Sequence, residues 1–278
     1  MKAKLILSAM TMAAVVTANV AFAAPHWSHD EQDASEGWGG VEDVTTPPLS
    51  PPLNFPYAEC AIGQHQSPVD LKYQVNAKKY DKLGVRYPDD TPDFFNSGHA
   101  VQANTSEGYQ GRLAIGDDVY PLVQFHFHAP AEHVIGQQTF SAELHFVHVR
   151  DDGRIAVLGV LLEEGAANPD IQTILDNVPA EEGTKNTAKQ KVIRLKSLLP
   201  RDLKHFYTYA GSLTTPPCSE GVSWFVLAKP ISLSTEQLAK LKDFFHELYD
   251  GSHDGYAHGN ARYVQALNGR VISGKVSN

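Results

Sequence analysis

The sequence predicts a mainly β protein that forms a single domain with a few peripheral helices. Three apolar runs of strand length span residues 122–128, 142–149 and 155–162. They are separated by turn signals such as Asp152-Gly153, which are typical of connections between strands. Because runs of this kind recur from 69 to 162 and helix signals are few, we expect a sheet at the centre of the fold.

Two helices are predicted by their capping residues. Asn168 followed by Pro169 is typical of a helix start, because Asn caps the first turn and proline fits the first helical position. A second helix follows Ser234, where Gln237 completes a capping box, and its apolar stripe predicts that it continues to Gly251. Both are expected at the periphery of the domain.

Two of the apolar runs carry histidines. His126 and His128 alternate with phenylalanines, so in a strand both imidazoles lie on one face and both phenyl rings on the other. Glu143 and His145 share one face of the next run, and pairing of the two runs would bring His145 opposite the first two histidines. Three neutral imidazoles that converge from rigid strands are the donor set of a catalytic zinc site, whose fourth position stays open for water. Unrelated surface histidines are the alternative interpretation.

The first residues have the pattern of a secretory signal peptide. Lys2 and Lys4 precede an apolar run, and Ala21-Phe22-Ala23 is a small-x-small cleavage site. We therefore expect residues 1–23 to be removed and residues 24–278 to form one exported domain, periplasmic or secreted. No later segment is apolar enough to span a membrane. The mature chain keeps 21 basic and 32 acidic residues, and its net charge of −11 argues against nucleic acid as a partner.

The sequence holds two cysteines, Cys60 and Cys218. In an exported protein an even number of cysteines favours a disulfide, with two buried free thiols as the alternative. Cys218 directly follows residues 214–217, so a disulfide would tether that loop. Residues 45–56 are rich in proline, which disfavours helix and central strand, and we expect an extended surface insert there.

Several motifs that follow one another along the chain resemble those of the α-class carbonic anhydrases, in particular the exported bacterial type. They are Gln66-Ser67-Pro68-Val69-Asp70, Ser97-Gly98-His99-Ala100, the two histidine runs, Gly211-Ser212-Leu213-Thr214-Thr215-Pro216-Pro217, Trp224 and Asn260-Ala261-Arg262. The resemblance implies a large, mostly antiparallel, twisted central sheet. It also implies an enzyme that holds Zn²⁺ and catalyses the reversible hydration of carbon dioxide to bicarbonate and a proton, with a zinc-bound hydroxide as nucleophile.

The resemblance assigns the zinc ligands and the groups that orient them. The ligands would be His126, His128 and His145. Their orienting groups would be Gln124 for His126, Glu143 for His145 and the backbone carbonyl of Asn260 for His128. The sequence supports part of this assignment, since Gln124 and Glu143 lie on the same strand faces as the histidines they would hold. The alternative for Glu143 is a solvated carboxylate, which its apolar neighbours disfavour.

Further residues have catalytic and substrate-binding roles by the same resemblance. The hydroxyl of Thr214 would donate its proton to Glu132, so its oxygen would have to accept a hydrogen bond from the nucleophile. Thr215 and the backbone amide of Thr214 would contact bicarbonate. An apolar wall for carbon dioxide would consist of Val147, Val157, Leu213 and Trp224. Ordinary core packing is the alternative for those four side chains.

Proton release also has a candidate in His99, which matches the proton-shuttle histidine of the family. An imidazole titrates near neutral pH, so it can pass a proton from water to buffer. An exposed loop histidine without a role is the alternative. The chain departs from the family at His29, which stands where a tyrosine usually borders the water network. His133 and His148 are not assigned to metal, and we expect each to satisfy a buried hydrogen bond.

The predicted partners are small molecules: carbon dioxide and bicarbonate as substrates, with sulfonamides and anions as inhibitors. The resemblance also allows a homodimer. Two other interpretations stay open. One is a non-catalytic, carbonic-anhydrase-like binding module, although such relatives typically lack a ligand histidine. The other is a cupin-like metal protein, because the spacing of His126, His128 and Glu132 imitates the first cupin motif and a two-histidine, one-carboxylate set favours iron. That motif requires glycines where Tyr120 and Thr139 stand.

Overall fold

A computed structural model of the chain describes residues 25, 27–29, 37–43, 54–72, 75–76, 83–186, 191–245 and 259–275. The expected signal peptide, residues 1–23, lies outside the described residues, and so do residues 45–53 of the expected insert. Asp43 and Asn54, which flank this part of the chain, lie side by side, because the amide of Asp43 donates a hydrogen bond to the carbonyl of Asn54 over 2.8 Å.

The described residues form the following strands and helices. The strands are β1 (Val75–Asn76), β2 (Leu83–Arg86), β3 (Asp93–Asn96), β4 (Val101–Asn104), β5 (Arg112–Ile115), β6 (Asp118–His128), β7 (Ala142–Val149), β8 (Ile155–Glu164), β9 (Lys185–Asn186), β10 (Phe206–Ser212), β11 (Glu220–Leu233) and β12 (Ser273–Lys275). The α-helices are α1 (Glu59–Ile62), α2 (Pro169–Leu175) and α3 (Thr235–Asp243), and the 3₁₀-helices are η2 (Trp38–Gly40) and η4 (Leu195–Leu198).

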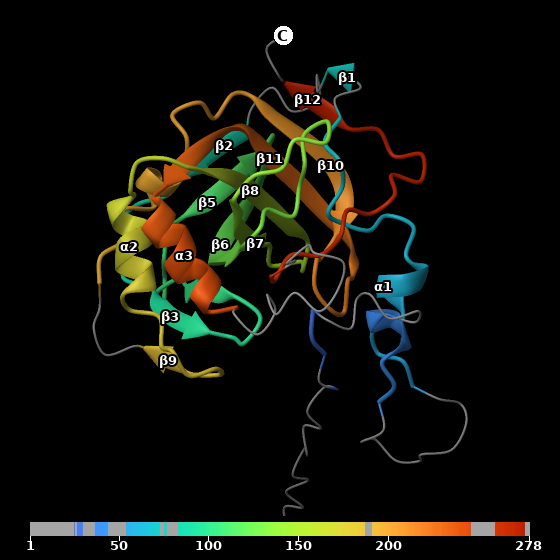
Figure 1. Ribbon diagram of the computed structural model, residues 1–278. Helices are drawn as coiled ribbons and strands as arrows, with labels where there is room; N and C mark the ends of the chain where they lie inside the picture. Colours follow the sequence, from blue (N-terminus) through green and yellow to red (C-terminus); the bar gives the residue numbers. More distant parts are fainter. Residues whose placement is uncertain are drawn as a thin grey trace, which may run out of the picture.

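One large twisted sheet passes through the centre of the molecule (Figure 1). Its strand order is β1-β12-β10-β11-β8-β7-β6-β4-β3-β9, and β5 joins β2 to β6. The paired strands are antiparallel except for β1 with β12 and β8 with β11, which are parallel. The prediction of a mainly β fold with a large, mostly antiparallel sheet is confirmed.

Three central strands correspond to the predicted apolar runs. β7 has the predicted bounds, whereas β6 begins at Asp118 and β8 continues to Glu164. The first part of β6 pairs with β5, with Tyr120 opposite Leu113, and this pairing extends the strand beyond its apolar run. β8 continues because it pairs with β11 as far as Glu164 opposite Leu233.

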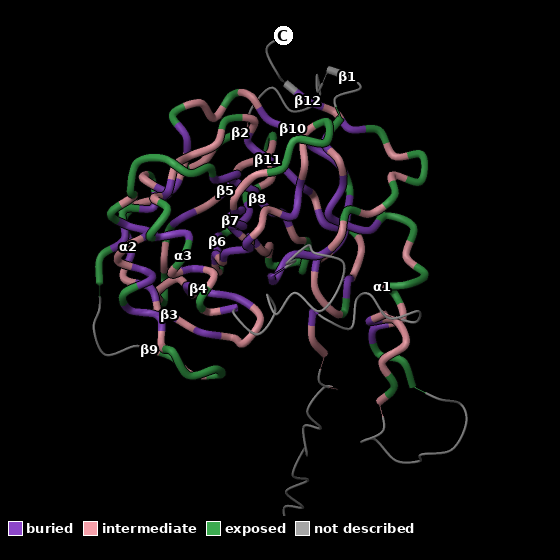
Figure 2. The backbone as a smooth tube through the Cα atoms, viewed as in Figure 1, coloured by how far each residue is buried: buried purple, intermediate pink, exposed green. Residues whose placement is uncertain are grey.

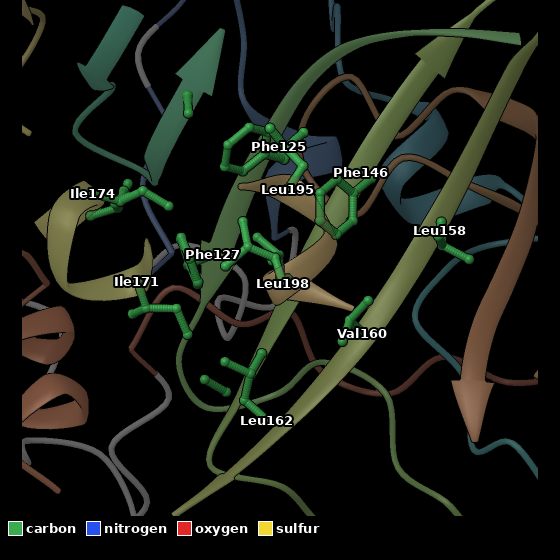
Figure 3. Close-up of a cluster of buried hydrophobic side chains, with 14 of the residues drawn as sticks. Phe125, Phe127, Phe146, Leu158, Val160, Leu162, Ile171, Ile174, Leu195 and Leu198 are labelled. Atoms are coloured by element: carbon green, nitrogen blue, oxygen red, sulfur yellow. The ribbon is translucent and has the colours of Figure 1, made fainter. Parts of the chain in front are cut away.

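The two faces of the sheet bury different side chains. On one face Phe125 and Phe127 of β6 pack in a large apolar cluster with Ile171 of α2 (Figure 3). A smaller apolar cluster contains Val157 and Trp224. Buried positions concentrate in the central strands (Figure 2). Successive side chains of a strand point to opposite faces. Because the phenylalanines of β6 face the large cluster, the histidines of β6 face away from it.

The helices α2 and α3 lie side by side next to the sheet (Figure 1). Both begin at the predicted caps. The side chain of Asn168 accepts hydrogen bonds from the amides of Asp170 and Ile171, and Ser234 forms its capping box with Gln237. The side-chain amide of Gln237 also donates to the carbonyl of Asn168 over 2.7 Å, which joins the two helices.

The predicted end of the second helix at Gly251 was wrong, because α3 ends at Asp243. The amides of Phe244 and Phe245 bond to carbonyls three residues earlier, which is the tighter geometry of a final turn. Phe245 is 2% exposed and belongs to the large cluster. Burial of its ring therefore accompanies the end of the helix, which the apolar stripe alone did not indicate.

Cys60 of α1 and Cys218 are joined in a disulfide, as expected. Hydrogen bonds support both halves: the side chain of Gln66 donates to the carbonyl of Cys218 over 3.1 Å, and Nη2 of Arg262 donates to the carbonyl of Cys60 over 2.9 Å. The loop between β10 and β11, which contains Thr214, is thereby tied to α1. No described helix is long and apolar enough to cross a membrane.

Candidate active site

The pairing of β6 with β7 brings three histidines together. His126 lies directly opposite His145, and His128 lies opposite Glu143. The ring centroids are 5.0 Å apart for His126 and His128, 5.3 Å for His126 and His145, and 4.6 Å for His128 and His145. One nitrogen from each ring lies within 4.8 Å of the other two. Strand geometry thus gathers three nitrogen donors at one point of the sheet.

The first two imidazoles are each held through one nitrogen. Nδ1 of His126 lies 2.8 Å from Oε1 of Gln124, and Nδ1 of His128 lies 2.8 Å from the backbone oxygen of Asn260. In both rings Nε2 is therefore the nitrogen for which the described part of the chain provides no orienting partner. The structure places the two predicted orienting groups beside the histidines to which they were assigned.

Asn260 also fixes the end of β6 with its fully buried side chain. Its Oδ1 accepts a hydrogen bond from the amide of Ala129 over 2.8 Å. Its Nδ2 donates to the carbonyls of Phe127 and His99, each over 2.9 Å. One residue thus connects His128, the backbone of its strand and the loop that carries His99.

Glu143 lies beside His145 and belongs to a buried polar network. Its Oε1 is 3.0 Å from Nε2 of His145, although this contact falls outside strict hydrogen-bond geometry, and 2.8 Å from Nδ1 of His133. Its Oε2 accepts hydrogen bonds from the amides of Glu132 and His133. Nε2 of His133 lies 2.7 Å from the hydroxyl of Tyr209. His133 therefore satisfies buried hydrogen bonds, as predicted.

His148 likewise has two buried hydrogen-bond partners, and it does not belong to the group of three clustered histidines. Its Nε2 lies 2.8 Å from the hydroxyl of Tyr87, and its Nδ1 lies 3.1 Å from the carbonyl oxygen of Ala156. Burial lowers the pKa of His148 to about 3, so this ring is neutral. The expectation of a structural hydrogen-bonding role is confirmed.

Burial keeps the three clustered imidazoles neutral at neutral pH. Burial lowers the pKa of His126 well below the ordinary 6.5 and that of His128 to about 4. It also lowers the pKa of His145, although the negative charge of Glu143 acts in the opposite direction. Burial by itself would raise the pKa of Glu143, but His133 and His145 outweigh it and hold that pKa well below its usual range. The result is three neutral donors beside one ionised carboxylate.

Glu132 and Thr214 lie beside the histidines. Oε1 of Glu132 accepts a hydrogen bond from the amide of Arg262 over 2.9 Å, and Oε2 lies 3.8 Å from Nδ1 of His145. Burial raises the pKa of Glu132 to about 7. The Thr214 hydroxyl is near enough to lower that pKa, yet no described residue offers Oε2 of Glu132 a partner that meets strict hydrogen-bond geometry. Thr215 follows in the same loop and is partly exposed.

The four residues predicted as an apolar wall belong to the smaller apolar cluster. Val157 and Trp224 are each 2% exposed, and Val147 and Leu213 are partly buried against this cluster. The ring of Trp224 lies 4.9 Å from that of His145, centroid to centroid. Its Nε1 donates to a backbone carbonyl of β10 over 2.9 Å, so its polar atom is satisfied. The apolar cluster therefore adjoins the nitrogen donors.

His99 lies in the loop between β3 and β4 and does not belong to the group of three clustered histidines. Its ring stacks on that of Trp27, with centroids 3.9 Å apart and planes inclined by 14°. The amides of His99 and Ala100 donate to Oγ of Ser97, and Asn260 donates to the carbonyl of His99. The backbone of His99 is thus fixed, while its side chain is partly exposed.

Two further residues of this region, Tyr209 and Gly159, were missed by the sequence interpretation. Tyr209 continues the polar network, because its hydroxyl lies 2.9 Å from Oγ of Ser67 as well as close to His133. Gly159 lies opposite His145 in the pairing of β7 with β8. A glycine inside a strand signals a close approach, so Gly159 was detectable. Tyr209 had no local signal, since its partner Ser67 is 142 residues away in sequence.

The fold and the donor set define a class of protein before any relative is considered. It is a large-sheet protein that presents three neutral imidazoles to one point beside an apolar wall, an arrangement typical of a metalloenzyme for a small substrate.

Comparison with known proteins narrows this class. Residues 53–276 match the family model described as eukaryotic-type carbonic anhydrase. A carbonic anhydrase of Pectobacterium carotovorum is 35% identical over 247 residues, which cover 89% of this chain and 90% of that protein. The solved structure of α-carbonic anhydrase from Thermovibrio ammonificans with the inhibitor sulfanilamide has a TM-score of 0.75 and 35% identity, covering 90% of this chain and 100% of that one. Carbonic anhydrase Cah3 from Chlamydomonas reinhardtii, in complex with acetazolamide, has a TM-score of 0.68 and 34% identity, covering 78% and 93%.

The chain belongs to the eukaryotic-type, or α, carbonic anhydrase family. It is an enzyme of that family, and the resemblance noted in its sequence is confirmed.

Proposed function

We propose that the protein catalyses the reversible hydration of carbon dioxide to bicarbonate and a proton, with a zinc ion held by His126, His128 and His145. The observation that carries this proposal is the strand register, which sets His126 opposite His145 and brings one nitrogen of each ring within 4.8 Å of the others. Membership of the carbonic anhydrase family supports the reaction.

The donor set fits zinc. Three neutral imidazoles are the ligands of the zinc type that keeps a position open for water. Among the described residues nothing bonds to the buried Nε2 of His128, and a metal ion would supply the partner that a buried polar atom normally has. Since Gln124, Asn260 and Glu143 face the other nitrogens, the donors for the ion are Nε2 of His126, Nε2 of His128 and Nδ1 of His145. When bound, zinc lowers the pKa of a water ligand to about 7, for which carbonic anhydrases are the established example.

A second group of side chains with metal-ligand spacing consists of His133, Glu143 and His145. Nδ1 of His133 and Oε1 of Glu143 lie 2.8 Å apart, so the hydrogen bond between them already occupies two of the three donors. All three side chains are buried, whereas His126 is partly exposed and gives the first group access to solvent. We therefore assign Glu143 and His133 to orienting His145, and the ion to the three histidines.

Thr214 and Glu132 are proposed to orient the attacking oxygen. A threonine hydroxyl has a single proton, so donating it to Glu132 leaves Oγ1 of Thr214 as an acceptor. The raised pKa of Glu132 applies to the site without a cation, and a cation nearby favours the ionised carboxylate that this arrangement requires. The amide of Arg262, which donates to Oε1 of Glu132, supports the same ionised form.

Carbon dioxide is proposed to rest against Val147, Val157, Leu213 and Trp224. The molecule is uncharged and has no net dipole, so an apolar wall binds it weakly and does not retain the charged product. Bicarbonate would then contact Thr215 and the backbone amide of Thr214. Both threonines belong to the loop that the disulfide ties to α1, which favours a constant position for this contact.

His99 is proposed as the group that passes the product proton to buffer. An imidazole exchanges protons efficiently near neutral pH. The ring of His99 is partly exposed while its backbone is fixed by Ser97 and Asn260, so it can reach solvent from a constant position.

Inhibition and export follow as proposals from neighbouring observations. Sulfonamides are proposed as inhibitors because the relative from T. ammonificans was solved with sulfanilamide and the one from C. reinhardtii with acetazolamide. The Cys60–Cys218 disulfide is compatible with an oxidising compartment, and this supports the proposal that residues 1–23 direct export.

Neither alternative to this function is favoured by an observation. Residues 53–276 match the carbonic anhydrase family model, and this match argues against the cupin interpretation. A non-catalytic binding module would retain the fold, but a ligand histidine is typically missing in such relatives. Here His126, His128 and His145 are all present and converge.

The test pairs metal analysis with a stopped-flow hydration assay on the purified mature protein. We expect about one zinc per chain together with hydratase activity that sulfanilamide inhibits. His126→Ala should lose both zinc and activity. The control His65→Ala, which removes a half-exposed histidine outside the cluster, should keep both. Iron without hydratase activity, or hydration that survives His126→Ala, would contradict the proposal.

A further inference from the structure

The ring of His29 is buried, yet neither of its nitrogens has a hydrogen-bond partner among the described residues. The residue is 3% exposed, and both Nδ1 and Nε2 are unsatisfied. Buried polar atoms are nearly always bonded to protein or to ordered water, and an imidazole has two of them. Because no described protein atom satisfies them, we expect water at both nitrogens of His29.

The surroundings of His29 explain why protein atoms do not bond to it. The rings of Trp27, Trp38 and His99 lie 5.4, 5.5 and 6.4 Å away by centroid, and each is inclined to the His29 ring by 65° to 73°. The indole nitrogen of Trp38 already donates to the carbonyl of Ser28. His29 is therefore enclosed by aromatic edges and faces that hold the ring in place without occupying its nitrogens.

This aromatic enclosure is connected to the proposed zinc site. Asn260 accepts from His128 with its backbone oxygen and donates to the carbonyl of His99 with its side chain, so both histidines are fixed by one residue. The ring of His99 in turn stacks on Trp27, a wall of the enclosure. His29 also interacts electrostatically with His128 and His99. It thus lies next to His99, the proposed exit for the proton, and near enough to His128 for that residue to affect its pKa.

We propose that His29 is a proton-relay residue of this site: water satisfies both of its ring nitrogens, and the ring passes protons between that water and His99. The inference rests on the proposed function, because a proton has to leave the site each time carbon dioxide is hydrated.

The relay step needs no partner other than water. The unprotonated nitrogen of His29 accepts a proton from one water molecule, which forms a new N–H bond. The N–H bond at the opposite nitrogen breaks, and its proton passes to the water on the side of His99. The ring ends in its other tautomer and returns to the first by losing the new proton to solvent and gaining one from solvent at the opposite nitrogen, so one proton leaves the site per cycle and the charge balances.

The charges around His29 favour passage over retention of the proton. Burial, followed by the effects of His128 and His99, lowers the pKa of His29 well below 6.5. The ring is therefore neutral at neutral pH and holds the extra proton only briefly. Arg262, whose guanidinium lies over Trp38 at 5.5 Å from the ring centroid, is a described positive charge near the enclosure, and its sign also disfavours a lasting imidazolium.

The kinetic test uses two variants of the zinc-loaded enzyme. His29→Phe keeps an aromatic ring and removes both nitrogens, whereas His29→Gln keeps one hydrogen-bond donor and one acceptor but does not relay protons. We expect both to lower kcat about tenfold in weak buffer, with kcat/KM unchanged and kcat restored by concentrated imidazole. A His29→Gln enzyme with wild-type kcat would show that the residue anchors water without carrying protons, which overturns the proposal.

A double variant separates a relay in series from an independent route. If protons from His29 pass through His99, adding His29→Phe to His99→Ala should cause no further loss of kcat in weak buffer. A further loss of about tenfold would overturn the series arrangement with His99.

A spectroscopic measurement tests the water contact without using activity. Ring ¹⁵N resonances of the zinc-loaded protein, assigned by their loss in His29→Phe, should show a neutral His29 near pH 7 whose N–H proton exchanges rapidly with water. A charged ring, or an N–H proton protected from exchange, would overturn the inference. Absence of zinc and activity in the wild type would instead contradict the proposed function, so the two failures are distinguishable.

Discussion

Gly159 lies where a side chain would collide with Glu143, because a Cβ built on Gly159 would be 2.8 Å from Oε1 of that carboxylate. The same oxygen lies beside His133 and His145. The space left by the missing side chain is therefore part of what positions His145.

Gly159→Ala should weaken zinc binding about tenfold, because the displaced carboxylate would no longer orient His145. The free energy of unfolding should fall by about 1–3 kcal/mol through overpacking. The matched control is Gly84→Ala in β2, where a Cβ would make an ordinary 3.4 Å contact with Ala114. Chelator competition and urea unfolding measure the two effects, and equal zinc affinity in the two variants would contradict the positioning role.

Glu143→Gln tests the charge of the same carboxylate at constant shape. The neutral amide cannot replace an anion that faces His133 and His145, so zinc affinity should fall about 10–100-fold. Glu163→Gln, at an exposed position of the neighbouring strand β8, is the control and should bind zinc as the wild type does. Zinc affinity that is insensitive to Glu143→Gln would show that the charge is irrelevant to the site.

Asp170 provides a pH-dependent contribution to stability at the start of α2. The residue is 3% exposed and accepts hydrogen bonds from Arg194 and Ser197. Burial alone would raise its pKa, but these bonds outweigh burial and lower the pKa below 3.8. Because the folded-state pKa is the lower one, the stabilisation is complete above the unfolded pKa and is lost as the pH falls through the folded pKa.

Asp170→Asn should therefore lower the free energy of unfolding by about 1–3 kcal/mol at pH 7, and the difference from wild type should shrink below about pH 4. Urea unfolding at a series of pH values measures this, with the exposed Asp117→Asn as control. A difference that stays constant down to pH 3 would contradict the linkage.

Replacing both cysteines, Cys60→Ser with Cys218→Ser, should lower the free energy of unfolding by about 2–5 kcal/mol. Hydration should also slow, because the loop with Thr214 loses its tie to α1. Wild-type protein treated with a thiol reductant should behave in the same way. If the reduced wild type and the double variant both unfold at the wild-type urea concentration, the disulfide has no stabilising role.

The histidine faces could be predicted because they depend on a local rule. Residues at positions 126 and 128 of a strand share a face whatever the rest of the chain does, and the next strand supplied His145. The caps at Asn168 and Ser234 are local in the same sense. The end of α3 does not follow from a local rule, because it accompanies burial of Phe245, which belongs to the large cluster.

By itself, then, the sequence determined which side chains share a strand face, where two helices begin and which cysteines could pair. Only the tertiary structure decided that the hydroxyl of Tyr209 reaches Ser67 across 142 residues, that Gly159 leaves room for Glu143, and that His29 is buried with no described partner at either nitrogen. The physical reason is the distance along the chain over which each kind of interaction acts. Backbone geometry acts over a few residues and appears in local patterns, whereas contacts between distant segments depend on how the whole sheet packs.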